Sequence, residues 1–62
     1  MNKFVYFVKG YYYNRYNSKE CFSVIIEVEE KSSNSIMKSV MRTADIPIEL
    51  RRSVVISDIV VL

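Results

Sequence analysis

Two strand-like segments joined by a short polar turn constrain the fold of this chain more than any other feature. Residues 3–13 are rich in β-branched and aromatic side chains, and residues 20–29 alternate apolar and polar side chains with a period of two. Between them, residues 14–18 are polar and include two asparagines, which suit a turn. We therefore expect the two segments to form an antiparallel hairpin.

Side-chain chemistry indicates the register of this hairpin. Pairing Tyr13 with Lys19 across a five-residue loop places apolar residues opposite one another on one face, in the pairs Phe4 with Val28, Tyr6 with Ile26 and Val8 with Val24. On the other face the same register sets Lys3 against Glu29 and Phe7 against Ile25. Gly10 falls opposite Phe22, where a missing side chain leaves room for the ring or marks a β-bulge. A slip by one residue would exchange the core face and the solvent face.

The remainder of the chain predicts one helix and a third strand. Residues 31–35 supply several possible helix N-caps. An apolar stripe follows, made of Ile36, Met37, Val40, Met41 and Ala44, and it predicts a helix over residues 35–45 that Pro47 stops. Residues 46–52 form a connector, in which Pro47 suits the start of a helical turn. Residues 54–61 have apolar side chains on both faces and predict a strand.

These elements predict a single domain over residues 1–62, of the α+β class, with the order ββαβ. We expect a three-stranded sheet of order 2-1-3 with one helix packed on one face, because the first strand is apolar on both faces and suits the centre. This order also makes the helical connection a right-handed crossover between parallel strands two and three. A chain of 62 residues buries only about 60% of its unfolded surface, so we expect marginal stability.

The composition argues against catalysis and against metal or cofactor sites. There is no histidine, one cysteine and one glycine, so neither a nucleophile–base pair, nor a zinc site, nor a glycine-rich phosphate loop can be assembled. Glu27 and Glu29 share a strand face, which fits a solvent-facing edge better than a paired-carboxylate active site. Asp58 interrupts an apolar strand, either to discourage edge-to-edge pairing or as a functional charge. We expect no enzyme activity, no cofactor and no metal.

Cysteine usage and hydropathy predict a cytoplasmic protein without a membrane partner. Cys21 stands alone and cannot form an intramolecular disulfide, whereas small secreted domains usually carry several, and we expect it to be a half-buried strand residue. The first residues lack the apolar stretch and the cleavage site of a signal peptide, and no apolar run approaches the roughly 20 residues that cross a bilayer. From Met1 to Leu62 the chain looks like a complete small gene product.

One helix covers only one sheet face, which leaves an apolar face as a candidate for protein contact. The residues expected there are Val5, Phe7, Tyr11, Tyr13 and Ile25. Contiguous apolar patches of this kind usually mark an interface, with a protein partner or in a homodimer. The alternatives are simple packing of the tyrosines and single-stranded nucleic-acid binding, in which aromatic rings stack on bases while nearby cations hold phosphates. The candidate nucleic-acid contacts are Lys9, Arg15, Tyr16 and Lys19, although a net charge of +2 is a weak signal by itself.

The chain also resembles a known group of small proteins. The resemblance is carried by residues 3–9 (Lys-Phe-Val-Tyr-Phe-Val-Lys), residues 22–28 (Phe-Ser-Val-Ile-Ile-Glu-Val), the Ser/Asn-started helix and the closing residues 54–62. Together they look like the strand-strand-helix-strand proteins encoded in enterobacterial phages and prophages. The resemblance covers most of the chain as a pattern of strand-forming residues, without the connector 46–52 or the tyrosine cluster. It implies an accessory phage role and carries over no functional residue.

Overall fold

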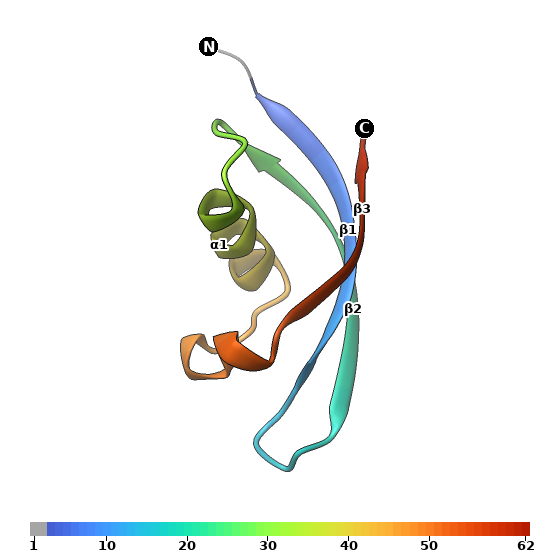
Figure 1. The fold of residues 1–62 in the computed structure, drawn as a ribbon, viewed down its shortest axis with the longest axis vertical. Helices are drawn as coiled ribbons and strands as arrows, with labels where there is room; N and C mark the ends of the chain where they lie inside the picture. The colour runs from blue at the N-terminus through green and yellow to red at the C-terminus, as the bar shows by residue number, and fades with distance from the viewer. Residues whose placement is uncertain (1–2) are drawn as a thin grey trace.

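The computed structural model describes residues 3–62 and shows an α+β domain with the predicted order of elements (Figure 1). Its sheet has three strands in the order β2-β1-β3, namely β1 (Phe4–Tyr13), β2 (Lys19–Val28) and β3 (Val55–Val61). β2 and β3 are both antiparallel to β1 and therefore run in the same direction. The helix α1 (Ser33–Thr43) and the 3₁₀ helix η1 (Ile48–Ser53) connect them on one side of the sheet. The predicted ββαβ fold and the sheet order 2-1-3 are confirmed.

The β1–β2 hairpin has the predicted register over its whole length. Phe4 is paired with Val28, Tyr6 with Ile26, Val8 with Val24, and Tyr13 with Lys19. Asn14 stabilises the turn, because its side-chain oxygen accepts hydrogen bonds from the backbone N–H groups of Tyr16 and Ser18, at 2.8 and 3.0 Å. Asn17 adopts a left-handed φ of 61°, a conformation that asparagine tolerates better than most residues.

Gly10 lies where β1 is crowded from two sides. Its pairing partners are Phe22 on β2 and Ile56 on β3, and the β1–β3 register shifts at this point, between Lys9 and Gly10. A Cβ at Gly10 would meet the backbone carbonyl oxygen of Val55 and the tip of the Phe22 ring. The absent side chain thus makes room for the ring and marks the bulge as well.

α1 has defined ends that the sequence pattern located only approximately. Ser32 is the N-cap and accepts a hydrogen bond from the Ser35 backbone N–H, so the helix begins at Ser33 instead of the predicted residue 35. The helix ends at Thr43, four residues before Pro47, because Asp45 adopts a left-handed φ of 58°. The Ile46 N–H then bonds the Met41 carbonyl at 2.9 Å, and both side chains are buried, as in a Schellman motif. The prediction that proline terminates the helix was therefore wrong.

η1 covers the part of the hairpin that α1 is too short to reach. An 11-residue helix is about 16 Å long, whereas a 10-residue strand spans about 33 Å. α1 packs against β2, and η1, which follows Pro47 as predicted, contacts β1. Ser53 fixes η1 there, because its Oγ accepts a hydrogen bond from the Tyr13 N–H at 3.1 Å.

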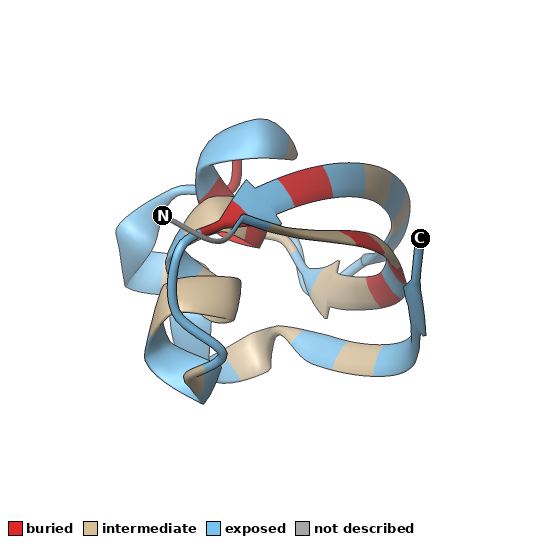
Figure 2. Ribbon diagram, turned by 90° about the horizontal axis from the view of Figure 1, so that it is seen from above, coloured by how far each residue is buried: buried red, intermediate tan, exposed pale blue. Residues whose placement is uncertain are grey.

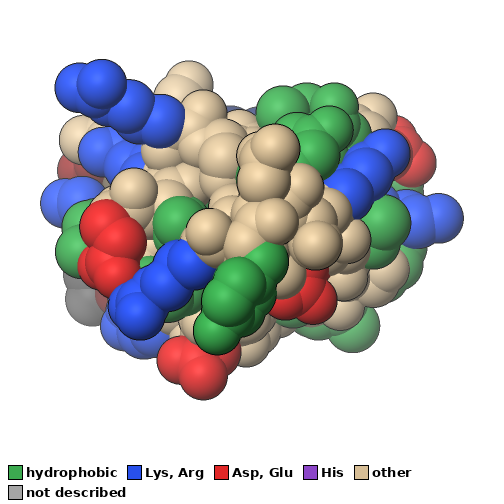
Figure 3. Space-filling view, turned by 90° about the horizontal axis from the view of Figure 1, so that it is seen from below, with side chains coloured by type: hydrophobic (Ala, Val, Ile, Leu, Met, Phe, Trp, Pro, Cys, Tyr) green, Lys and Arg blue, Asp and Glu red, His purple; other side chains and the backbone are tan. Residues whose placement is uncertain are grey.

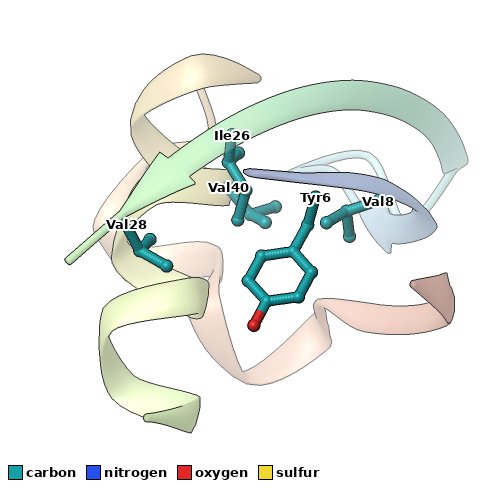
Figure 4. Packing of buried hydrophobic residues seen from close by; sticks show 5 residues of the cluster. All are labelled: Tyr6, Val8, Ile26, Val28 and Val40. Atoms are coloured by element: carbon teal, nitrogen blue, oxygen red, sulfur yellow. The ribbon is translucent and has the colours of Figure 1, made fainter. Parts of the chain in front are cut away.

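The core is small and lies between the hairpin and α1. Tyr6 and Val8 of β1 and Ile26 and Val28 of β2 meet Val40 of α1 (Figure 4). Val8 and Val40 are completely buried. Coloured by burial, the buried residues fall on the hairpin and the helix side, whereas none lies on β3 (Figure 2). α1 thus packs over the β2 side of this sheet face, and β3 is left largely exposed.

Candidate interaction surface

The sheet side opposite α1, which we call the outer face, carries an apolar row across all three strands. Phe7 in the centre is paired with Ile25 on β2 and with Val60 on β3, so the three side chains stand on the same side of the sheet. Ile25 is 61% exposed and Val60 is 44% exposed. Val5 and Leu62 extend this row, since the Leu62 N–H donates to the Val5 carbonyl at 2.9 Å.

A second apolar group lies on the outer face near the hairpin loop. The rings of Tyr11 and Tyr13 meet edge to face, with centroids 6.0 Å apart. The Lys19 ammonium lies over the Tyr11 ring, 4.2 Å from its centroid. Val55 is the β3 partner of Tyr11. Tyr11 is half-buried, and its ring contacts both the Lys19 ammonium and the Tyr13 ring.

A polar row separates these two apolar groups. Lys9 is paired with Ser23 on β2 and with Asp58 on β3, and all three residues are exposed. The five predicted interface residues (Val5, Phe7, Tyr11, Tyr13 and Ile25) therefore share the outer face, in two groups. The contribution of β3, through Val60 and Leu62, makes the first group the larger one.

Two of the four predicted nucleic-acid contacts, Arg15 and Lys19, are engaged within the domain. Arg15 forms an ion pair with Glu49 of η1 at 2.8 Å, and Lys19 is held over Tyr11. Tyr16 is 88% exposed in the hairpin loop, whereas Lys9 stands mid-strand on the outer face. The end of the molecule with the hairpin loop shows basic and acidic side chains interspersed (Figure 3). In this view the basic side chains do not form the continuous groove that tracks a phosphate backbone.

Lys3 pairs diagonally across the sheet, and not with the partner predicted for it. Its Nζ lies 3.0 Å from the Glu27 carboxylate, whereas the hairpin register predicted Glu29 opposite Lys3. β2 ends at Val28, so Glu29 lies beyond the ladder and acts on Lys3 only as a weaker neighbouring charge. The hydrogen bond and the charge of Glu27 raise the pKa of Lys3 above its ordinary value of 10.5. Both groups are solvent-exposed, so this pair adds little to stability.

The sequence pattern gave no indication of a hollow that lies between α1 and η1. It has a volume of about 370 Å³ and is lined by Lys38, Met41, Arg42, Asp45, Ile46, Ile48 and Arg51. Its bases come from two elements that are separated in sequence, and Arg51 also donates to the Asn34 side-chain oxygen at 2.9 Å. The hollow is open and combines one carboxylate with three cations.

Several chemical features of the described residues bear on function. No group of three Cys, Asp or Glu residues within residues 3–62 is placed to hold a metal ion. None of the helices in the described part is long and apolar enough to span a membrane. Cys21 is exposed on the outer face and not half-buried as predicted, because β2 is an edge strand and no element covers that side.

Comparisons with protein-family models, with curated proteins and with solved structures found no match to this chain.

Proposed function

We propose that this chain is a non-enzymatic protein-binding domain that makes contact through the outer face of its sheet. The observation that carries the proposal is the apolar row Ile25–Phe7–Val60, which crosses every strand on the side without a helix. Val5 and Leu62 make this a patch of five neighbouring apolar side chains, two of them more than 60% exposed. A contiguous patch of this kind on a small domain is typical of an interface.

The polar row beside this patch suits the rim of such an interface. Lys9, Ser23 and Asp58 are exposed and lie next to the apolar group. Interfaces commonly have an apolar centre and a polar, solvent-accessible rim. We place this activity in the cytoplasm, because a single cysteine is unusual for a small secreted domain. The resemblance to phage and prophage proteins is consistent with an accessory role.

A charge introduced at Ile25 tests the proposal. Ile25→Lys places an ammonium group in the patch at an exposed position, so the fold should be kept. Ile48→Lys is the matched control, since Ile48 is also an exposed isoleucine, at 74%, but lies on η1. In affinity capture from a bacterial lysate followed by mass spectrometry, we expect Ile25→Lys to lose the proteins that wild type and Ile48→Lys retain. Equal capture by all three chains would contradict the proposal.

A further inference from the structure

The hollow between α1 and η1 carries the positive charge excess of the chain. It is lined by the three cations Lys38, Arg42 and Arg51 and by one carboxylate, that of Asp45. The chain has nine basic and seven acidic residues, so six of each remain elsewhere and balance one another. The two ion pairs found within residues 3–62 both lie outside the hollow. Its cations are therefore not neutralised by ion pairs with the described part of the chain.

These cations form a row along α1. Arg51 reaches α1 from η1, because its guanidinium donates to the Asn34 side-chain oxygen at 2.9 Å. Lys38 and Arg42 follow Asn34 at intervals of four residues, and residues four apart are neighbours on a helix surface. The row therefore extends over about 12 Å. The bond to Asn34 orients the Arg51 side chain and uses one of its N–H groups, which leaves others for a ligand.

Apolar side chains form the floor of the hollow beside the row of cations. Met41 and Ile46 are each 6% exposed, and Ile48 is exposed at the edge. The C-terminal end of α1 lies here, and its backbone carbonyl groups disfavour an anion. Three of these carbonyls already accept hydrogen bonds from the N–H groups of residues 44–46, which reduces this effect.

We propose that the hollow binds an acidic segment of a partner protein, in which carboxylates flank an apolar side chain. Guanidinium groups bind carboxylates through paired hydrogen bonds, and the floor accepts the apolar side chain. A row of about 12 Å is too long for one small anion and suits carboxylates on several residues of a peptide. The hollow is open, at about 370 Å³, so it cannot enclose a small molecule as ligand pockets do, whereas a peptide can continue beyond it.

A nucleic-acid strand fits this hollow less well than an acidic peptide. Among the described residues that line the hollow, none is aromatic, so no ring is placed to stack on a base. The Asp45 carboxylate can accept hydrogen bonds from peptide N–H groups, whereas a phosphodiester backbone has no such donor and would be repelled. The combination of apolar floor, cations and one acceptor therefore favours a peptide.

The hollow is separate from the outer face. α1 and η1 both lie on the other side of the sheet (Figure 1). An acidic segment in the hollow therefore leaves the apolar row of the outer face free for a different contact.

NMR titration of the isotope-labelled protein with a synthetic peptide tests the site. The probe is the blocked peptide Asp-Glu-Leu-Leu-Glu-Asp, and its control is the uncharged Asn-Gln-Leu-Leu-Gln-Asn. We expect only the acidic peptide to shift the backbone signals of residues 38–51 in a saturable way. Arg42→Gln and Arg51→Gln should each weaken binding by about twofold to fivefold. Arg52→Gln is the matched control, since Arg52 is also an exposed arginine of η1 but does not line the hollow, and it should bind like wild type.

Three outcomes would overturn the inference, provided that circular dichroism shows each variant to be folded. The first is a wild type without saturable shifts on addition of the acidic peptide. The second is an equal loss of binding in Arg52→Gln, which would indicate unspecific attraction to basic side chains. The third is a short oligothymidylate that binds the hollow more tightly than the peptide does. Ile25→Lys should bind the peptide like wild type, so a failure here is distinguishable from a failure of the outer-face proposal.

Discussion

Replacing Gly10 with alanine tests how tightly the three strands are packed at the bulge. An added Cβ would overlap the Val55 carbonyl oxygen and lie 2.7 Å from the tip of the Phe22 ring and 3.2 Å from the Ile56 Cα. The ring can move, but the two β3 backbone atoms move only with the strand. Overpacking of this kind costs about 1–3 kcal/mol, and contact with backbone puts Gly10→Ala near 3 kcal/mol.

This cost is large for a domain of this size. At about 0.05–0.15 kcal/mol per residue, the free energy of unfolding of such a chain is roughly 3–9 kcal/mol. A loss of about 3 kcal/mol lowers the Tm of a domain this small by roughly 12–24 °C. Thermal and urea unfolding followed by circular dichroism measure both quantities. The control is Lys9→Ala, the exposed neighbour of Gly10, which should change stability by less than about 0.5 kcal/mol.

Whether Gly10→Ala lowers or raises the free energy of unfolding distinguishes steric overlap in the folded state from reduced entropy of the unfolded chain. Gly10 has no positive φ, so its backbone conformation is open to alanine. If sterics were unimportant, the reduced entropy of the unfolded chain would make Gly10→Ala about 0.4–1 kcal/mol more stable. An unchanged or raised Tm would therefore refute the close packing of β3 against Gly10.

Three further changes test the core, the helix cap and the exposed ion pair. Val40→Ala empties part of the core, where Val40 is fully buried, and should lower the free energy of unfolding by about 2 kcal/mol in urea titration. Ser32→Ala removes the N-cap hydrogen bond and should cost about 1 kcal/mol, measured in the same way. The pKa of Lys3, followed by NMR, should lie above 10.5 and fall towards that value in Glu27→Gln. Because this pKa is raised, the small contribution of the pair is present below pH 10.5 and is lost as the pH rises through the Lys3 pKa.

The hairpin was predictable from sequence because its constraints are local. A period-two alternation fixes which side chains share a face, and the five-residue loop leaves only one register that pairs Phe4 with Val28. The central position of β1 followed from its apolar side chains on both faces. These features gave the sheet order and the five candidate residues of the outer face.

The features that were not predicted from the sequence each depend on the local backbone conformation at one position. The left-handed Asp45 ends α1 earlier than Pro47 would, and aspartate in that role is hard to distinguish from an ordinary surface acid. The register of β3 depends on the bulge at Gly10, so Val60 could not be assigned to the outer face in advance. Lys3 can reach the carboxylates of Glu27 and Glu29. Because β2 ends at Val28, Glu29 lies outside the strand and Lys3 pairs with Glu27.

One comparison tests most directly whether the apolar outer face, and not the basic hairpin, is the binding surface. Three tagged chains are used for capture from lysate with and without nuclease: wild type, Ile25→Lys and a triple variant in which Lys9, Arg15 and Lys19 are alanine. Nucleic-acid contacts depend on these cations, whereas the apolar patch does not. We expect the proteins held by wild type to survive nuclease and the triple change and to be lost with Ile25→Lys. Capture that disappears with nuclease and with the triple variant, and persists in Ile25→Lys, would contradict the account.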